Sequence, residues 1–309
     1  MMNLCKGTAF TLIAVVMFCM MNYFYEQSSH YRSIEGLYRY EDMPDDLELI
    51  NFGSSHAEYG IDYSVSPNVY NSFNFALSSQ ALEMDNALLK TYAAHLKEGC
   101  VVLITISTFS LYFDAESLIE GQYGRYYRIL PYRLIPGSNV GDWMQYRAFP
   151  IVSSQKNVFQ AFAPRSEPVH ILPLAPTEKS YFVERGIERA NGHKEYLQDG
   201  KSERQINALK EMIDLCYENG WEPVLISTPV TFYYDTVFSE GEKEQISGDL
   251  QELMKCYPSL QYFDYGRHPS FYTDPEMFID ADHLNQMGRE VFSKILFSDL
   301  EAYGYLRAS

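Results

Sequence analysis

The sequence is short of cysteine, of positive charge and of phosphate-binding motifs, and each shortage argues against a class of protein. Its five cysteines, at positions 5, 19, 100, 216 and 256, include no CxxC pair, so neither a structural zinc site nor a disulfide scaffold is indicated. Lysine and arginine number 24 against 41 aspartates and glutamates, and the net charge of −17 argues against binding nucleic acid through a basic surface. No glycine-rich phosphate loop is present, and His30, His95, His170 and His193 have no carboxylate or cysteine at ligand spacing. We therefore expect neither a cofactor nor a metal ion.

What the sequence does have is an N-terminal segment without charge. No charged residue occurs from Gly7 to Tyr25, a run of 19 residues that is close to the ~20 needed for a helix to cross a bilayer. The large rings at its end suit a membrane interface better than a signal-peptidase site, so we expect an uncleaved transmembrane anchor over residues 1–26 and a polar stalk over 27–45. The alternative is a buried core helix.

The charges that flank this run bear on its orientation. Lys6 and the amino terminus favour a cytoplasmic N-terminus, whereas Arg32 and Arg39 on the other side favour the reverse. We expect a single-pass protein of the cell membrane whose folded domain lies outside the cytoplasm, an expectation that depends in part on the family resemblance described below.

The rest of the chain predicts an α/β domain. With 46% hydrophobic and 21% charged residues among 309, the composition is that of a globular protein and excludes disorder, collagen and coiled coil. Short buried strands alternate with amphipathic helices, the strands at 47–52, 69–77, 100–106, 223–227 and 260–264 and the helices at 80–97, 203–219, 240–256 and 285–303. Gly99 is expected to end the first of these helices. The alternation predicts a three-layer domain with a parallel sheet over residues 46–309, interrupted by an insertion at about 107–200.

The turn after the first predicted strand exposes serines. It reads Phe52-Gly53-Ser54-Ser55-His56. Sites in parallel sheets form at the carboxyl ends of strands, and a turn of small residues places a hydroxyl beside the free N–H groups of a helix start. Taken alone, such a turn more often serves only as a helix N-cap.

A carboxylate and a histidine occur together near the other end of the chain. Asp280 lies three residues before His283, immediately ahead of the last predicted helix. At this spacing a carboxylate can fold back onto one imidazole nitrogen while the other nitrogen faces a serine as general base. We therefore combine Ser55, His283 and Asp280 into a candidate Ser-His-Asp set.

Neighbouring residues receive other interpretations. His56 directly follows the serine and is interpreted as a wall of the cleft, because adjacent residues of an extended chain point apart. Asp282 is interpreted as a cap or a solvent-facing residue. Asp264 and His268 form a weaker alternative to the pair of Asp280 and His283.

These motifs resemble those of the SGNH/GDSL hydrolase superfamily, whose flavodoxin-like domain carries its nucleophile just after the first strand. Gly53-Ser54-Ser55 stands in place of Gly-Asp-Ser, and Asp280–Asn285 stands in place of the D-x-x-H-L-N block. The resemblance covers roughly residues 46–303 without the insertion. It implies Ser55 as nucleophile, His283 as base and Asp280 as the acid that orients the base.

Two other blocks of the family fit less well. The second block is similar to Asn74–Ser79, with Ser79 in place of the family's glycine, so the resemblance implies the N–H groups of Ser55 and Ser79 as the oxyanion hole. The third block, Gly-x-Asn-Asp, has no counterpart at Ser107–Ser110. One oxyanion donor is therefore missing or supplied elsewhere, and such a loss typically costs ~10²–10³ in rate.

The insertion contains an unusual cluster of charge and aromatic rings. Its segment 121–147 holds four arginines and a single acid within a strongly acidic protein. We predict that side chains at its start line or cover the serine cleft and bind an anionic or hydroxyl-rich substrate, namely Tyr123, Arg125, Tyr126, Tyr127 and Arg128. The alternatives are contact with lipid headgroups or a partner, and a loop whose rings pack on the main core.

The anchor and the departures from the family pattern are similar to membrane-tethered SGNH proteins of bacterial cell-surface acylation, such as the teichoic-acid D-alanylation protein DltD and related O-acetylation proteins. This resemblance implies a serine esterase or acyltransferase that acts on an acylated polysaccharide or teichoic-acid-like polymer beside a membrane-bound O-acyltransferase (MBOAT). The rival hypothesis is a noncatalytic SGNH-like scaffold that binds the polymer or the acyltransferase. The missing third block favours the scaffold, and the complete Ser-His-Asp set favours the enzyme.

Overall fold

The structure, a computed structural model, describes residues 2–28, 31, 38–68, 70–113, 123–152 and 179–307. The chain divides into two compact units. Unit 1 consists of residues 1–43 and 118–170, and unit 2 consists of residues 44–117 and 171–309. The insertion predicted at 107–200 is therefore shared between the two units. His30, Arg32 and His170 lie outside the described residues.

Unit 2 is built around a parallel sheet. Its described residues form five strands, β1 (Leu47–Phe52), β2 (Ser72–Asn74), β3 (Leu96–Thr105), β4 (Glu222–Ile226) and β5 (Gln261–Phe263), in the order β2-β1-β3-β4-β5. Every neighbouring pair is parallel, and Ile50 of β1 lies between Phe73 of β2 and Val102 of β3. This is the 2-1-3-4-5 order of doubly wound sheets, in which sites form at the carboxyl ends of the two strands where the order reverses, here β1 and β3.

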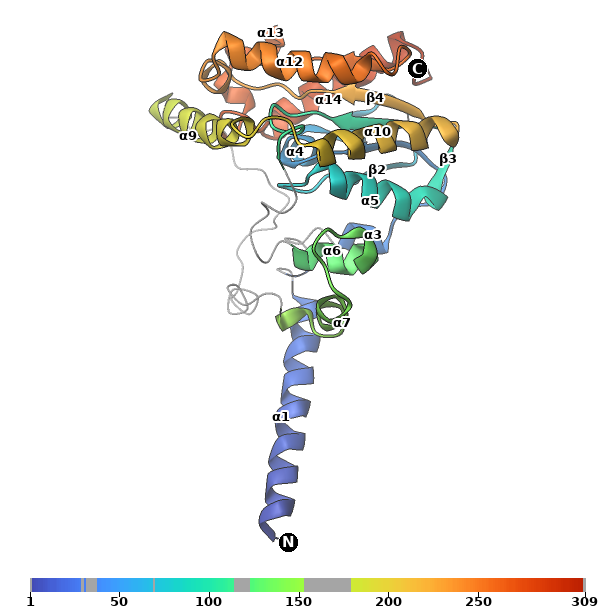
Figure 1. Ribbon diagram of the computed structural model, residues 1–309, viewed down its shortest axis with the longest axis vertical. Coiled ribbons are helices and arrows are strands. Elements are labelled where there is room, and N and C mark those ends of the chain that lie inside the picture. The colour runs from blue at the N-terminus through green and yellow to red at the C-terminus, as the bar shows by residue number, and fades with distance from the viewer. Residues whose placement is uncertain are drawn as a thin grey trace. The chain divides into compact units, whose positions relative to one another are not determined.

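Helices connect the strands of unit 2. α4 (Ser55–Gly60) and the 3₁₀ turn η1 (Tyr63–Val65) follow β1, and α5 (Leu82–Tyr92) and η2 (Ala93–His95) lead to β3. α9 (Lys179–Leu197) and α10 (Glu203–Glu218) precede β4, α11 (Phe232–Asp235) and α12 (Glu240–Met254) precede β5, and α13 (Pro269–Tyr272), η6 (Pro275–Met277) and α14 (Gln286–Ala302) end the unit. In Figure 1, α5, α10 and α12 lie one above the other on the near side of the sheet, and α14 lies behind.

Both faces of the sheet are buried. Alternate strand residues belong to one apolar cluster with α14, among them Leu49, Val101, Leu103, Val224 and Ile226 against Phe292, Leu296 and Phe297. The intervening residues, including Ile50, Val102, Ile104 and Leu225, are equally buried. Because strand side chains alternate with a period of two, this second set faces the opposite side, where α5 and α10 pack together.

The predicted elements occur with shifted ends. The strand predicted over 69–77 is reduced to β2, an edge strand that pairs only with β1 among the described strands. The helix predicted over 80–97 ends at Tyr92, and the expectation that Gly99 ends it is wrong. Gly99, with φ of +77°, lies inside β3, where its N–H donates to the carbonyl of Gly220 (2.8 Å). The chain thus reaches the sheet earlier than the helical spacing suggested.

Unit 1 contains the N-terminal helix and part of the insertion. Its elements are α1 (Met2–Gln27), α3 (Tyr38–Glu41), α6 (Tyr123–Ile129), η4 (Tyr132–Leu134), α7 (Val140–Ala148) and η5 (Pro150–Val152). The stretch Gly7–Gln27 of α1 is long and apolar enough to span a membrane, a property that it shares with signal sequences. Only 6% of its most apolar window is buried, so the alternative of a buried core helix is wrong.

The carboxyl-terminal end of α1 packs on the insertion within unit 1. The rings of Phe18 and Phe149 are 5.2 Å apart between centroids. The side chain of Asn22 accepts a hydrogen bond from the Ile151 N–H (3.2 Å) and donates one to the carbonyl of Ala148 (3.4 Å). The carboxyl-terminal end of α1 therefore packs against residues 148–151, which are more than a hundred positions away in the sequence.

Candidate active site

β1 ends at Phe52, and at Gly53 the chain turns sharply into α4. This glycine has φ of +134°, and a Cβ here would lie 2.9 Å from Cβ of Thr105 on β3, so a side chain does not fit. Ser54 occupies the N-cap of α4, yet its side chain makes no capping hydrogen bond, and Ser55 is the first residue of the helix. Helix capping therefore accounts for neither serine side chain.

The loop before α14 presents His283. The Ile279 N–H donates to the carbonyl of His283 (2.8 Å), which closes the loop. Oδ1 of Asp280 accepts the N–H groups of Asp282 (3.2 Å) and His283 (3.0 Å). The side chain of Asn285 then caps α14 by accepting the Gly288 N–H (3.0 Å). These bonds fix the backbone on both sides of the histidine.

Ser55, His283 and Asp280 lie in one hydrogen-bonded row. Ser55 Oγ is 2.7 Å from Nε2 of His283, and Nδ1 of the same ring is 3.0 Å from each carboxylate oxygen of Asp280. Because the carboxylate accepts from Nδ1–H, Nε2 is left to accept the serine hydroxyl. Residues separated by more than 220 positions in sequence are thus brought within hydrogen-bond distance, as the sequence predicted.

The pKa of His283 reflects two opposing influences. The ring is only 8% exposed, and burial lowers the pKa of an imidazole. The charges of Asp282 and Asp280 outweigh burial, so the pKa of His283 is raised above its ordinary value of 6.5. The raised pKa makes His283 a stronger base than an ordinary imidazole. It also means that a larger fraction of protein molecules carry a protonated His283 near pH 7.

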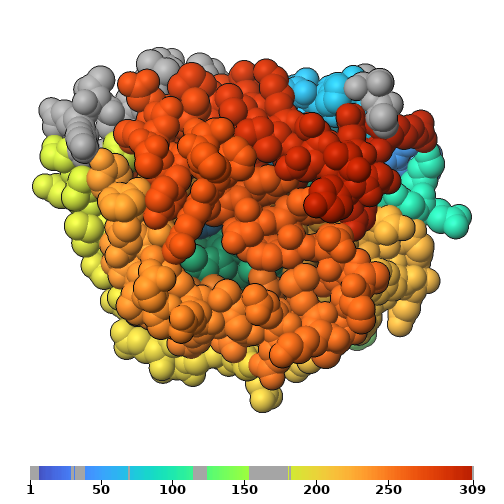
Figure 2. Space-filling model, turned by 90° about the horizontal axis from the view of Figure 1, so that it is seen from above, coloured from blue at the N-terminus to red at the C-terminus, as the bar shows by residue number. Residues whose placement is uncertain are grey.

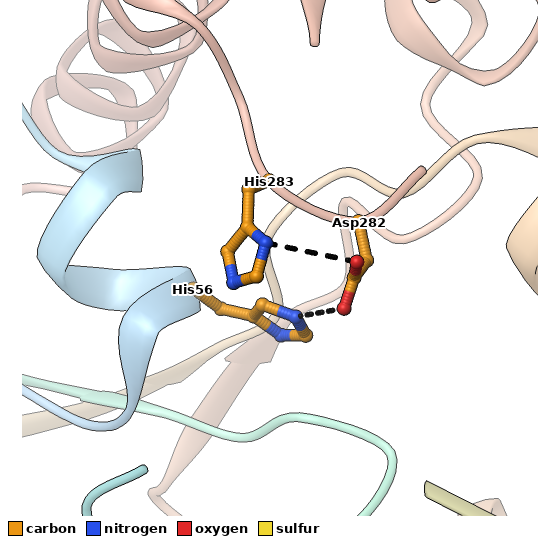
Figure 3. Close-up of side chains that lie close together, drawn as sticks. All are labelled: His56, Asp282 and His283. Atoms are coloured by element: carbon orange, nitrogen blue, oxygen red, sulfur yellow. Dashed lines mark hydrogen bonds and ion pairs between the residues drawn. The ribbon is translucent and has the colours of Figure 1, made fainter. Parts of the chain in front are cut away.

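Asp282 is buried, and the expectation that it caps a helix or faces solvent is wrong. It is 1% exposed, its Oδ2 accepts from Nε2 of His56 (2.9 Å), and its Oδ1 lies 3.7 Å from Nδ1 of His283. Figure 3 shows this carboxylate on one side of the two imidazoles, with a dashed line to each. Burial opposes its ionisation, but His283, His56 and the Arg189 guanidinium hold the pKa of Asp282 well below its usual range.

Arg189, on α9, is a site residue that the sequence analysis missed. Its Nε donates to Oδ1 of Asp282, and its Nη2 donates to Oδ2 of Asp282 (3.1 Å) and lies 3.4 Å from Nε2 of His283. A positive charge therefore lies beside the nitrogen that faces Ser55. The sequence signal that could have indicated this helix was the helical spacing of three residues of α9 that prove to be buried, namely Phe182, Ala190 and Leu197.

His56 lies beside the row of Ser55, His283 and Asp280 and contacts a different serine. Its Nδ1 is 2.8 Å from Oγ of Ser107, which follows β3 where the family's third block is missing. The rings of His56 and His283 are 5.1 Å apart between centroids. Burial, against the opposing effect of Asp282, lowers the pKa of His56 below 6.5. His56 lines a cavity of about 540 Å³, but the described residues that line this cavity do not include Ser55, so it is a different space from the serine cleft in which the sequence placed His56.

The turn that carries Ser79 is fastened to the turn that carries Ser55. Ser79 lies between β2 and α5 with φ of +56°. Next to it, Gln80 donates to the carbonyls of Phe75 (3.1 Å) and Gly53 (3.4 Å). The Leu77 N–H also donates to the carbonyl of Gly53 (3.2 Å). Hydrogen bonds therefore hold together the two turns that carry Ser55 and Ser79, whose N–H groups the sequence analysis named as oxyanion donors.

Three possible metal ligands also meet in this cluster. His56, Asp282 and His283 bring ligand atoms within 4.8 Å of one another. Each group already has a partner, however, and the Arg189 guanidinium binds the carboxylate that a cation would need. These donors fit a hydrogen-bonded network better than a metal site.

His193 also has an acidic neighbour, one that is distant in the sequence. Its Nδ1 lies 2.7 Å from the hydroxyl of Tyr234 and 4.0 Å from Oδ2 of Asp282. Burial lowers the pKa of His193 to about 3, so the ring is neutral near pH 7. The carboxylate is far away in sequence, and ligand spacing gave no sign of it.

The weaker pair, Asp264 and His268, supports local structure. Oδ1 of Asp264 accepts from the hydroxyl of Ser227 (2.6 Å) and from the Gly266 N–H (3.0 Å). His268 occupies the N-cap of α13 and accepts the Ser270 N–H (3.3 Å). Both residues are thus accounted for by turns and caps near β5.

The insertion residues predicted to bind substrate belong to unit 1, whereas Ser55 belongs to unit 2. The side chain of Tyr123 lies outside the described residues. Tyr126 and Tyr127 are buried, the Arg125 guanidinium stacks on the ring of Tyr126 at 4.9 Å, and that of Arg128 stacks on Tyr31 at 5.4 Å. These contacts all lie within unit 1.

Comparison with known proteins gives little beyond this geometry. No family model and no curated protein matches the sequence. Among solved structures, the chain is similar to one described as "a putative platelet activating factor from Streptococcus pneumonia", with 14% identity and a TM-score of 0.41, over 96% of this chain and 98% of that chain. Because the identity and the TM-score are both low, we infer nothing about activity from this likeness.

Proposed function

We propose that the protein is a membrane-anchored serine acyl-ester hydrolase or acyltransferase of SGNH type, with Ser55 as its nucleophile. The observation that carries the proposal is the row in which Ser55 Oγ lies 2.7 Å from Nε2 of His283 while Asp280 holds Nδ1 at 3.0 Å. A serine, an imidazole and a carboxylate in this order form the arrangement that removes a serine proton. Its place after β1 of a doubly wound sheet supports the same conclusion.

In the proposed reaction, Ser55 Oγ attacks the carbonyl of an ester or thioester. Nε2 of His283 takes the hydroxyl proton and returns it to the leaving group, while Asp280 stabilises the imidazolium. The N–H groups of Ser55 and Ser79 are proposed to hold the oxyanion. Water as acceptor completes hydrolysis, and a sugar or polyol hydroxyl completes transfer.

The proposed setting is the outer side of the cell membrane. α1 has the length and apolarity of an anchor, and an anchor combined with the Gly53-Ser54-Ser55 turn and the departures from the family pattern resembles DltD-type proteins. The proposed substrate is an acylated polysaccharide or teichoic-acid-like polymer, with a membrane-bound O-acyltransferase as partner. We further propose that the insertion holds this polymer through Tyr123, Arg125, Tyr126, Tyr127 and Arg128, because four arginines gather there in a protein of charge −17.

A noncatalytic scaffold is the second candidate function. The observation that favours it lies after β3, where the family's Asn block is replaced by Ser107–Ser110. The hydroxyl of Ser107 contacts His56 at 2.8 Å, so it is not a simple replacement for an oxyanion donor. In this case the protein binds the polymer or the acyltransferase without turnover.

An active-site probe separates the two functions. Full-length protein in detergent micelles is treated with an alkyl fluorophosphonate, and the labelled serine is identified after digestion with trypsin. Cleavage after Arg39 and Lys90 releases Ser55 on peptide 40–90. We expect labelling at Ser55 that is lost in Ser55→Ala and at least ~100-fold slower in His283→Ala, because a general base typically contributes ~10²–10⁴.

The adjacent serine provides a matched control. Ser54 is buried at the N-cap of α4 and makes no capping bond, so Ser54→Ala is expected to keep the label on peptide 40–90. A folded wild-type protein that leaves Ser55 unlabelled, and that hydrolyses p-nitrophenyl esters no faster than Ser55→Ala, supports the scaffold instead.

A further inference from the structure

A second serine, histidine and aspartate lie in hydrogen-bonded order beside the first set. Nδ1 of His56 is 2.8 Å from Oγ of Ser107, and Nε2 of His56 is 2.9 Å from Oδ2 of Asp282. Ser107 follows β3 just as Ser55 follows β1, and these strands are neighbours in the sheet. Two adjacent strand ends thus each carry a serine with its own imidazole and carboxylate.

The charges around Asp282 fix the direction of these hydrogen bonds. Arg189 donates to both carboxylate oxygens, and Asp282 is held in its charged form. A carboxylate only accepts, so Nε2 of His56 carries the proton and Nδ1 presents its lone pair to Ser107. Burial lowers the pKa of His56 and keeps the ring neutral near pH 7. The Ser107 hydroxyl therefore donates to a neutral imidazole, as an activated serine does.

Ser107 and His56 line a cavity of about 540 Å³, a volume within the range of small-molecule sites. Figure 2 shows the hollow, with the teal segment at the end of β3 visible at its bottom inside an orange rim. The floor is buried, whereas rim residues such as Glu244 and Arg267 are exposed. The described residues that line it include neither Ser55 nor His283, so the cavity leads to the second serine and not to the first.

The lining of the cavity indicates the class of molecule that it can hold. Much of the wall is apolar, with contributions from Leu111, Phe238, Ile246, Leu250 and Met254. The ionised groups comprise four carboxylates and two cations, and both cations, Lys243 and Arg267, are paired with Asp235 at 3.3 and 3.1 Å. An anionic acyl group is disfavoured by this balance, and an uncharged acyl chain is suited to the walls.

We propose that Ser107 is a second acyl-accepting nucleophile, with His56 as its general base, for an uncharged acyl ester bound in this cavity. Ser107 Oγ forms a bond to the carbonyl carbon while its proton passes to Nδ1 of His56. The tetrahedral intermediate then breaks the bond to the alcohol, which leaves with that proton. Water hydrolyses the Ser107 ester by the same route, releases the carboxylic acid and restores the serine.

The second site acts without Ser55, and the experiment uses this independence. The Ser55→Ala protein, full-length in detergent, is treated with an alkyl fluorophosphonate and digested with trypsin. Cleavage after Lys97 and Arg125 releases Ser107 on peptide 98–125, whereas Ser247, on the rim of the same cavity, is released on peptide 244–255. We expect label on Ser107, and none on Ser247, for which no contact with an imidazole is found among the described residues.

Variants of the base and a distant serine complete the test. His56→Asn is expected to slow labelling of Ser107 by at least ~100-fold, because general-base contributions are ~10²–10⁴. Ser107→Ala removes the label from peptide 98–125. The matched control, Ser259→Ala, changes an exposed serine that bonds only Tyr217 in the described structure (3.1 Å), and it leaves the rate unchanged. Thermal unfolding of each variant shows that it is folded.

Two outcomes overturn the proposal. One is that Ser107 stays unlabelled in Ser55→Ala protein that unfolds as cooperatively as the wild type. In that case the hydrogen bonds of Ser107, His56 and Asp282 have a purely structural role. The other is labelling of Ser107 at the wild-type rate in folded His56→Asn. A wild-type protein labelled on peptide 98–125 but not on peptide 40–90 supports the second site and contradicts the proposed role of Ser55, so the two proposals fail separately.

Discussion

The carboxylate of Asp282 accepts a 2.9 Å hydrogen bond from Nε2 of His56. Its other oxygen lies 3.7 Å from Nδ1 of His283, so one buried charge acts on both imidazoles. Each imidazole contacts a different serine, Ser107 for His56 and Ser55 for His283. The protonation of the two histidines is therefore coupled through a single carboxylate.

Asp282→Asn is predicted to shift the pH dependence of Ser55. The charge of Asp282 raises the pKa of His283, and an amide does not, so the pKa of His283 falls in the variant. Only the neutral imidazole accepts the serine proton, and the rising limb of the Ser55 labelling rate therefore moves to lower pH. Arg189 also loses its closer charged partner and keeps, among the described residues, only Asp280, 3.8 Å from its Nε, which lowers the free energy of unfolding. Labelling rates across neutral pH and urea unfolding measure the two effects.

Asp280→Asn is the comparison for this variant. It removes the group that holds Nδ1 of His283 and leaves Asp282 in place. We expect the labelling rate to fall even at pH values where the histidine is neutral, by up to ~10⁴, because the imidazole loses its orientation and tautomer. An Asp282→Asn profile that coincides with the wild type contradicts the coupling.

Arg189→Ala is predicted to move the rising limb of the Ser55 labelling rate to higher pH, opposite to the effect of Asp282→Asn. The guanidinium charge lowers the pKa of His283, so its removal raises that pKa and shifts the limb to higher pH. Arg185→Ala is the matched control, because Arg185 lies one turn earlier on α9 in an exposed pair with Glu188 (2.7 Å). Such a pair typically contributes less than ~1 kcal/mol, and we expect no shift. A shift to lower pH in Arg189→Ala is inconsistent with the network.

Much of unit 2 was predictable because its signals are local. The buried strand predicted over 100–106 is a nearly unbroken apolar run, and α10 and α14 have helical spacing of apolar residues, so local pattern alone located them. The end of α5 was misplaced because Gly99 reads as a helix stop, whereas its positive φ is used inside β3. α9 was missed because aromatic and proline-rich sequence around it hid its amphipathic pattern.

The candidate site was predictable only where a motif carried it. Asp280 and His283 are three residues apart, and the Gly53 turn precedes Ser55, so spacing and chain order were enough. The contacts of Asp282 with His56 and Arg189 span 226 and 93 residues and leave no trace in local sequence. A buried ion network depends on tertiary packing, which spacing rules do not contain.

Asp85→Asn is predicted to change the pH dependence of stability. Asp85 is 1% exposed, and its Oδ1 accepts the Gly53 N–H (3.0 Å) and the Gln80 side chain (2.6 Å), while its Oδ2 has no partner among the described residues. Burial raises the pKa of Asp85 to about 7, so its contribution to stability is complete below its ordinary pKa of 3.8 and is lost as pH rises through 7.

Asparagine keeps the acceptor and never ionises. Between acidic and alkaline pH, the free energy of unfolding of the wild type should therefore fall by about 4 kcal/mol more than that of Asp85→Asn, because each of the roughly three pKa units between 3.8 and 7 corresponds to about 1.4 kcal/mol. Urea midpoints at the two pH values measure this difference. Glu218→Gln, at an exposed position on α10, is the control and should follow the wild type. Parallel pH profiles for Asp85→Asn and the wild type would show that folding does not raise the pKa of Asp85.

The position of unit 2 relative to the membrane can be tested with a natural cysteine. Cys256 is exposed in unit 2, whereas Cys100 and Cys216 are buried. If the domain lies outside the cytoplasm, a membrane-impermeant maleimide applied to intact cells labels Cys256, and Cys256→Ser removes that label. Permeabilised cells provide the control for reagent access from the inside. If Gly7–Gln27 spans the bilayer as an uncleaved anchor, the chain stays in the membrane fraction after a carbonate wash. The chain immunopurified from that fraction then has an intact mass that includes residues 1–26. Labelling only after permeabilisation reverses the orientation, and a soluble chain that lacks those residues shows that α1 is a signal sequence.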